Sequence, residues 1–215
     1  MHSENFDLTT RQLAARERFV PTAPQLLWRV QSGALRIDSA PGGEPSRFVR
    51  LALPGDVIGV EQWAGTHDAL SQRALIASQV APVRADGDAM MHILMESVVV
   101  AHQRCREVVT LRTGPAARRI QALLLMFAEN GVVPGASARL VSQDFAVPHL
   151  TELSDILDVA PETVSRVFGS MREGNFLEAR HPQKARLSRQ ALSALEHVVN
   201  LPGVLATRTV QASCA

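Results

Sequence analysis

The stretch from Thr151 to Glu178, TELSDILDVAPETVSRVFGSMREGNFLE, carries the clearest structural pattern in the C-terminal part of the chain. Two segments of helical periodicity are separated by a short turn that ends at Pro161. In the second segment Glu162, Ser165 and Arg166 share one polar face, because residues i, i+3 and i+4 lie on the same side of a helix. Each segment also has an apolar face, made of Leu153, Ile156 and Leu157 in the first and Val164, Val167, Phe168 and Met171 in the second. The pattern predicts a helix-turn-helix, with the apolar faces packed together.

The polar face of the second helix carries the side chains that can read base pairs in the major groove. The guanidinium of Arg166 matches guanine O6 and N7, the carboxylate of Glu162 can accept from the cytosine amino group, and Ser165 suits either. A short polar face at the start of the second helix is also where a major-groove reader needs it. The alternative is an ordinary amphipathic helix pair whose solvent face carries Glu and Arg.

Further motifs add a resemblance to a known family. Residues 161–168, PETVSRVF, and 173–177, EGNFL, resemble the recognition helix and its exit in the Crp/Fnr family of bacterial transcription regulators. Upstream, residues 27–35, LWRVQSGAL, and 53–59, LPGDVIG, are similar to that family's sensory barrel. The resemblance implies an α+β chain with an N-terminal β-barrel like the cyclic-nucleotide-binding domain (a jelly roll), a long dimerisation helix and a C-terminal winged helix-turn-helix. Only seven residues separate Val20 from Trp28, where the family usually has an additional strand hairpin. The resemblance therefore leaves a truncated barrel as an alternative.

The periodicity along the chain divides it in the same way. We expect a barrel domain at 1–87, a dimerisation helix at 88–113, a winged helix-turn-helix at 114–200 and a weakly ordered tail at 201–215. Thr113-Gly114-Pro115 ends the long helix and marks the hinge. The expected elements are an amphipathic helix at 8–20, short strands from 26 to about 85, helices at 91–112 and 116–130, a strand within 131–141, a wing hairpin at 176–187 and a closing helix at 189–199.

The long helix carries an apolar stripe at alternating spacings of three and four. Its members are Met91, Leu94, Val98, Ala101, Cys105 and Val108. Such a stripe is typical of a coiled-coil seam, and the alternative is a helix that packs on its own barrel. The resemblance implies a parallel homodimer here, whose two recognition helices would lie about one helical turn of DNA apart and match a palindromic operator.

The resemblance also assigns the base-reading residues. In the family, the glutamate and arginine of the E-x-x-x-R pattern read a C and a G, and these correspond to Glu162 and Arg166. Ser165 resembles the Fnr branch and implies TTGAT-like half-sites. The cyclic-AMP receptor branch instead has an arginine where Pro161 stands here. Candidates for contacts to the DNA backbone are Thr163, Arg172, Lys184 and Arg186. Ala160 occupies the N-cap of the recognition helix, where a lost Ser or Thr cap costs about 1 kcal/mol.

Charge sets an expectation for affinity. The chain has 215 residues and a net charge of +1, and residues 115–200 hold nine basic and nine acidic side chains. Because phosphate attraction supplies much of the free energy of DNA binding, we expect modest affinity that falls with salt. The sequence shows no secretory signal and no apolar run of about 20 residues, so we expect a cytoplasmic protein without membrane contact, and the family resemblance adds RNA polymerase as a partner.

The sensory half offers few ligands, and we expect no cofactor. Cyclic-AMP sites in the family use a Gly-Glu pair and an Arg-Ser/Thr pair, whereas this chain has Gly59-Val60-Glu61 and Arg73-Ala74. Two cysteines cannot hold an iron–sulfur cluster that needs four thiolates. Haem stays open as an alternative, since His67, His92 and His102 lie in or near this half.

Cys105 has two interpretations. In a parallel dimer its two copies would meet, so it is either a small apolar seam residue or a redox switch. His102 and Cys105 could also pair a base with a thiol, but no third group orients them, and we expect no enzymatic activity. The alternative function is an effector-dependent or redox/haem sensor of the same fold, with weak intrinsic DNA binding, that acts through protein contacts.

Overall fold

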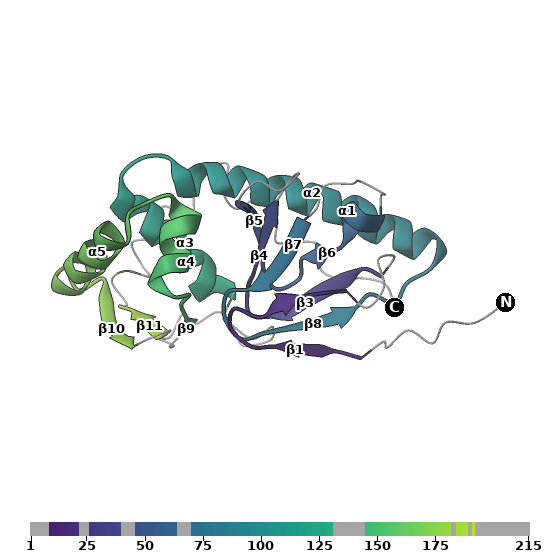
Figure 1. Cartoon of the computed structure of the whole chain (residues 1–215), viewed down its shortest axis with the longest axis horizontal. Coiled ribbons are helices and arrows are strands. Elements are labelled where there is room, and N and C mark those ends of the chain that lie inside the picture. Colours follow the sequence, from purple (N-terminus) through teal and green to yellow (C-terminus); the bar gives the residue numbers. More distant parts are fainter. Residues whose placement is uncertain are drawn as a thin grey trace.

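Two four-stranded antiparallel sheets form the N-terminal domain of the computed structural model (Figure 1). The structure describes residues 9–21, 26–39, 46–63, 70–130, 145–181, 184–188 and 191. The strands of one sheet, in spatial order, are β1 (Arg11–Leu13), β8 (Ser78–Pro82), β3 (Trp28–Ser32) and β6 (Val57–Ile58). Those of the other are β2 (Arg18–Phe19), β7 (Leu70–Ala74), β4 (Leu35–Ser39) and β5 (Arg47–Ala52). The short helix α1 (Val60–Trp63) follows β6.

Apolar side chains from alternate residues of the strands fill the interior of this barrel. Trp28 and Val30 on β3 meet Leu35 and Ile37 on β4 in one buried cluster. The ring of Trp28 is fully buried and lies edge-on to Phe19, with 5.2 Å between ring centroids. Successive strand residues point to opposite faces, so the residues between these apolar ones point out of the barrel.

Gly33 makes the corner at which the chain passes from one sheet to the other. Its φ is +84°, a left-handed conformation that glycine adopts without strain. A Cβ at this position would lie 2.3 Å from Oγ of Ser78 and 2.5 Å from the carbonyl oxygen of Ala77. The Ser78 hydroxyl in turn accepts a hydrogen bond from the Ala34 N–H at 3.0 Å. The close approach of the two backbones therefore requires glycine.

The helix expected at residues 8–20 is wrong. The chain there forms β1 and β2, which pair with β8 and β7, and a turn with Arg16 at φ +71° separates them. The buried residues of this segment are Leu13 and Phe19, six residues apart, and this spacing does not make one helical stripe. The predicted truncation of the barrel falls between Val20 and Trp28, and residues 22–25 of this segment lie outside the described part of the chain.

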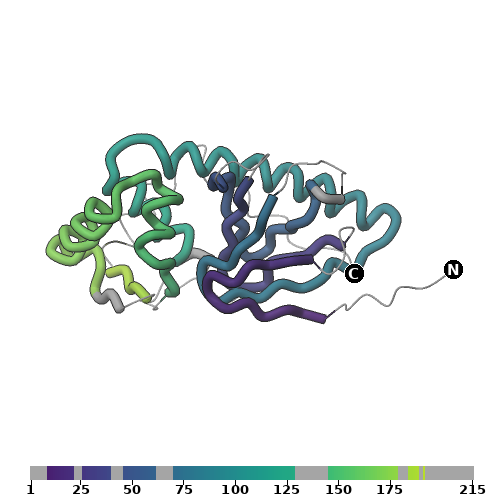
Figure 2. The backbone as a smooth tube through the Cα atoms, viewed as in Figure 1, coloured from purple at the N-terminus to yellow at the C-terminus, as the bar shows by residue number. Residues whose placement is uncertain are grey.

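The helices that follow agree with the expected periodicity. Helix α2 (Gly87–Arg112) runs along the β domain as far as the C-terminal domain, and α3 (Ala116–Asn130) starts after the predicted break (Figure 2). At that break the Thr113 hydroxyl donates to the carbonyl of Val109 at 2.7 Å, and Gly114 has a φ of +81°. No helix within the described ranges is long and apolar enough to cross a membrane.

The C-terminal domain is a winged helix. It contains α4 (Leu150–Leu157), α5 (Pro161–Glu173) and a three-stranded sheet in the order β10 (Leu177–His181), β11 (Lys184–Leu187) and β9 (Phe145–Ala146). The predicted helix-turn-helix and wing hairpin are confirmed. The expected closing helix at 189–199, the strand within 131–141 and the tail lie outside the described residues.

One hydrophobic core joins the two domains. It extends from Leu51, Leu53 and Leu75 of the β domain through Leu111 of α2 to Phe168 of α5. The break between α2 and α3 therefore separates two parts that share buried side chains.

Candidate nucleic-acid interface

The predicted base-reading residues lie together on the exposed face of α5, at the end of the molecule (Figure 1). The side chains of Glu162, Ser165 and Arg166 are all exposed. Within the described ranges these three side chains make no hydrogen bond or ion pair with the protein. Their donors and acceptors are therefore available to a ligand.

The opposite face of α5 anchors the helix. Val164 and Phe168 are almost completely buried, and Met171 is buried beside them. They pack with Ile156 and Leu157 of α4 in the large core. Burial of one face and exposure of the other is what a helix needs to enter a groove while it stays fixed to its domain.

The turn before α5 and the exit after it are both tight. Asp158 adopts a left-handed conformation at φ +51°, and its N–H donates to carbonyls in the last turn of α4. Pro161 is the first residue of α5, while Ala160 at the N-cap makes no side-chain cap bond, as the sequence predicts. At the exit, the Phe176 N–H donates to the Met171 carbonyl at 2.8 Å and directs the chain into the wing.

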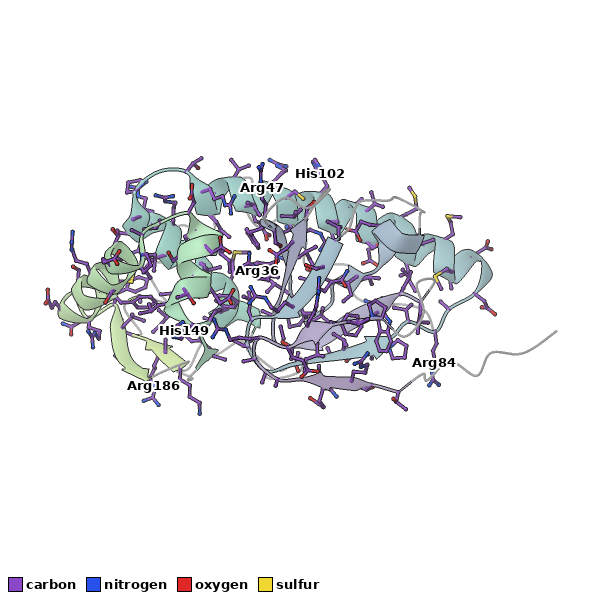
Figure 3. The ribbon with its side chains drawn as sticks, in the orientation of Figure 1. Arg36, Arg47, Arg84, His102, His149 and Arg186 are labelled. Carbon is purple, nitrogen blue, oxygen red and sulfur yellow. The ribbon has the colours of Figure 1, made fainter. Side chains whose placement is uncertain are left out.

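The candidates for contacts to the DNA backbone lie on α5 itself and on strand β11 of the wing. Arg172 at the end of α5 and Lys184 on the wing are exposed, whereas Thr163 and Arg186 are half-buried. Arg186 lies on the wing, on the same side of the molecule as His149 (Figure 3).

His149 also lies at this end of the molecule, although no sequence pattern points to it. It is the N-cap of α4, where its Nδ1 lies 3.4 Å from the backbone N of Thr151 and 2.9 Å from the Thr151 hydroxyl. Both side chains are exposed at the start of the first helix of the helix-turn-helix. Histidine is an unusual N-cap compared with Ser, Thr, Asp or Asn, so no sequence rule pointed to it.

The exposed apolar face of α2 differs from the predicted seam. Of the predicted residues, Met91, Val98 and Cys105 are exposed, Ala101 and Val108 are half-buried, and Leu94 is 7 % exposed. Leu94 packs against Leu27, Val57 and Val83 of the chain's own β domain. The exposed side chains at heptad spacing are Met91, Met95, Val98, His102, Cys105 and Val109, here called the α2 stripe. The stripe alternates spacings of four and three, so it keeps the period of a coiled-coil seam but shifts its register.

An ion pair fixes α2 to the β domain on the face opposite the stripe. Nε of Arg104 lies 2.8 Å from the carboxylate of Asp56 in the turn before β6, and Glu107 binds the same guanidinium at 3.0 Å. Burial lowers the pKa of Arg104, but the bonds to Asp56 and Glu107 outweigh it, so the pKa is raised above its ordinary value. Arg104 therefore stays charged and holds the helix in one rotation about its axis.

The two residues compared with a cyclic-nucleotide site bind other side chains. Glu61 accepts from Arg50 at 2.9 Å. Arg73 points out of the barrel, because Ala74 next to it belongs to the barrel core, and it binds Glu152 of α4 at 2.7 Å. Both side chains are therefore engaged in ion pairs within the protein.

The other candidate sensor residues lie apart. Cys105 is a free, exposed thiol, and His92 and His102 are exposed on the same helix. Among the described residues there is no group of three or more His, Cys, Asp or Glu side chains that could hold a metal ion, and His67 lies outside them. The haem hypothesis therefore receives no support from a clustered site within the described ranges, and the redox hypothesis for Cys105 stays a prediction.

Comparison with known proteins finds similarity in structure. No protein-family model and no curated protein matches the sequence. The transcriptional regulator TTHB099 of the CRP family from Thermus thermophilus superposes with a TM-score of 0.65 at 20 % identity, over 86 % of this chain and 95 % of that one. FixK2 from Bradyrhizobium japonicum superposes with a TM-score of 0.64 at 20 % identity, over 87 % of this chain and 96 % of that one.

A further solved structure leads to the same fold. TTHA1359, a CRP/FNR-family regulator also from Thermus thermophilus, gives a TM-score of 0.64 at 19 % identity, over 88 % of this chain and 98 % of that one. The matched structures cover the β domain, the long helix and the winged helix together. The chain therefore has the fold of the Crp/Fnr transcriptional regulators, as its sequence motifs predict.

Proposed function

We propose that this chain is a sequence-specific DNA-binding transcription regulator, not an enzyme, that binds a palindromic operator with TTGAT-like half-sites as a homodimer. The observation that carries the proposal is the exposed face of α5, where Glu162, Ser165 and Arg166 stand without protein partners in the described structure. Donors and acceptors of this kind, one helical turn apart, can reach adjacent base pairs in the major groove.

The α2 stripe supports the homodimer. Exposed methionine and valine side chains over several turns of a helix are unfavourable in water, and Met95 is 64 % exposed. A second copy of the same helix would cover them in a parallel pair, with Val98 and Cys105 near the two-fold axis. The pair would present two α5 helices to one face of the DNA.

A sensor of the same fold that acts through protein contacts is the second candidate. The equal number of acidic and basic side chains in residues 115–200 favours it, because such a domain attracts phosphate weakly. In both cases a DNA-bound or partner-bound chain would act on RNA polymerase.

The experiment that tests the proposal is fluorescence anisotropy of the purified chain on three duplexes across a salt series. One carries TTGAT half-sites, one carries TGTGA half-sites, and the third is a scrambled duplex of equal length. We expect preference for TTGAT and affinity that falls as salt rises, because counterions are released on binding. Equal weak binding to all three duplexes would contradict the proposal and favour the sensor.

A further inference from the structure

Two arginines face each other across neighbouring strands of the β domain. Arg36 on β4 and Arg73 on β7 are register partners, and both point out of the barrel. Like charges directly opposite one another destabilise a pair of strands. Arg36 is also buried, so water cannot screen the repulsion. Asp38 on the same strand binds Arg36 at 2.6 Å, so one further negative charge is needed to balance the two arginines.

Glu152 of α4 supplies that charge. Arg73 binds both oxygens of its carboxylate, at 2.7 and 3.1 Å, and Arg36 binds one of them at 2.9 Å. Arg16, in the turn before β2, approaches to 3.7 Å. The Glu152 side chain is only 5 % exposed although it belongs to the first turn of a helix in the other domain. A carboxylate this deeply buried is stable only while its partners stay in place.

Asp38 and Asp155 complete the set of charges. Nη2 of Arg36 lies 2.6 Å from a carboxylate oxygen of each. Burial lowers the pKa of Arg36, but bonds to Asp38 and Asp155 outweigh it, and the pKa is raised above its ordinary value. Three positive and three negative side chains thus balance in what is here called the Glu152 cluster, made of Arg16, Arg36, Asp38, Arg73, Glu152 and Asp155.

The other end of α4 is also held by arginines. Arg112 at the end of α2 donates to the carbonyls of Asp155 and Ile156, at 3.2 and 3.1 Å. Arg119 of α3 donates to the carbonyl of Leu157 at 2.9 Å. Guanidinium groups satisfy carbonyls that have no partner at a helix C-terminus. Helix α4 is therefore attached to the β domain at its start and to α2 and α3 at its end, and Figure 3 shows Arg36 between the β domain and α4.

The recognition helix depends on this attachment. Helix α5 packs on α4, so whatever fixes α4 also fixes α5. Helix α2 carries the surface proposed to lie along the two-fold axis. The Glu152 cluster is thus one of the contacts, beside the shared hydrophobic core, that hold α5 relative to that axis. In a dimer, the distance of α5 from the axis determines how far apart two half-sites must lie.

We propose that Glu152, Arg36 and Arg73 are positioning residues that fix the half-site spacing of the operator by locking the recognition helix to the β domain. The inference rests on the proposed function for its DNA readout, whereas the lock itself is a property of the free protein. The residues touch no base, so they would act on spacing and leave the base preference within a half-site unchanged.

The DNA test compares two lock variants with a matched control. Glu152→Gln keeps the shape of the side chain and removes its charge, and Arg73→Met keeps the apolar stem and removes the guanidinium. Glu178→Gln makes the same charge change on the exposed face of β10. On duplexes with half-sites moved apart by two base pairs, we expect the wild type and Glu178→Gln to lose affinity by ~10-fold or more. In both lock variants the affinities for the normal and the widened spacing should become nearly equal. The preference for each base in the half-site should be retained.

A distance measurement on the free protein tests the lock without DNA. Spin labels are placed at Gln31→Cys on β3 and Ser170→Cys on α5, both exposed, with Cys105 and Cys214 changed to Ser. Labelled chains are mixed with excess unlabelled chains, so that electron–electron distances report on one subunit. We expect a narrow distribution in the wild type and in Glu178→Gln, and a broad one in each lock variant.

The outcomes separate the two proposals. A narrow distribution in both lock variants, with circular dichroism showing that they fold, would overturn the lock. Broad distributions combined with undiminished spacing discrimination would overturn its role in spacing. If the wild type prefers no half-site sequence, the proposed function fails, and the distance distributions still decide whether the Glu152 cluster holds the two domains together.

Discussion

Arg166 lies on the exposed face of α5, and no side chain in the described ranges binds its guanidinium. We expect Arg166→Ala to weaken binding to the TTGAT duplex by ~1–3 kcal/mol and to relax discrimination at one base pair, because a bidentate contact to guanine is lost. Arg166→Lys should relax discrimination as well, since an ammonium lacks the planar pair of donors. Anisotropy on a set of duplexes, each with one base pair changed, measures both effects.

Arg172 provides the comparison for this prediction. It is exposed at the end of the same helix and is expected to contact phosphate. Arg172→Ala should therefore weaken binding about equally on every duplex and lower the salt slope by about one. If Arg166→Ala behaved in the same way, Arg166 would be a backbone contact and the assignment of the reading face would fail.

Individual residues differ in how far the sequence determines their role. Glu162 and Arg166 could be placed on one face because helical periodicity is local, and the structure shows both side chains exposed. Glu152 could not be placed in the same way, because an acidic residue in the first turn of a helix ordinarily faces water and the positive end of the helix dipole. Its burial depends on Arg36 and Arg73 being in register, and register arises only when distant strands pair.

The start of α5 is weakly capped, and this can be improved. Ala160 is exposed and has an extended backbone, with no side-chain bond to the free N–H groups of the first turn. A hydroxyl there can accept from the N–H of Glu162 or Thr163, so we expect Ala160→Ser to raise the free energy of unfolding by ~0.5–1 kcal/mol. Urea unfolding followed by circular dichroism measures this change. Ala160→Gly is the control; if it stabilised the chain as much as Ser, the gain would not come from the cap.

The α2 stripe gives a prediction at the level of one helix. Val98 is exposed at its centre, and Val98→Glu would place two carboxylates at the axis of a parallel pair. We expect this variant to sediment as a monomer at concentrations at which the wild type is a dimer, because charges at seam positions are desolvated without a partner. Analytical ultracentrifugation over a concentration series measures the shift.

Thr110→Glu is the matched control for the stripe. Thr110 is exposed on α2 but follows Val109 by one residue, so it lies about 100° away from the stripe. We expect its association to equal that of the wild type. If both variants dissociated equally, general charge repulsion would account for the effect; if neither dissociated, another surface would form the dimer.

Sequence patterns predicted some elements well and others poorly, for physical reasons. Helices α3 and α5 have one apolar face each, so their periodicity fixes both their type and their buried side. Helix α2 has two apolar faces, and periodicity alone cannot say which one covers the chain's own barrel; Leu94 was therefore placed on the wrong side. Strands β1 and β2 have three and two residues, too few to show alternation, and their pairing with β8 and β7 is what defines them.

At the scale of the whole molecule, the boundary near Thr113 divides the chain by sequence but not by packing. Buried side chains continue from Leu53 of the β domain through Leu111 and Ile120 to Phe168. The Glu152 cluster crosses the same boundary with charges that are stable only in pairs. Domains that share a core and an ion-pair cluster are expected to unfold together.

Arg36→Met tests this coupling. The substitution keeps part of the buried stem but leaves the carboxylates of Glu152, Asp38 and Asp155 without their common partner. We expect it to lower the free energy of unfolding by ~3–5 kcal/mol, since removal of one member of a buried ionic group leaves uncompensated charge. Urea unfolding should show one transition in the wild type, observed with the same midpoint through tryptophan fluorescence of the barrel and through circular dichroism of the helices.

Arg18→Met is the control for this prediction. It removes an exposed guanidinium from β2 and should leave the midpoint nearly unchanged. Two separate transitions in the wild type would show that the β domain and the winged helix unfold independently. An Arg36→Met midpoint equal to that of Arg18→Met would show that the Glu152 cluster does not contribute to stability.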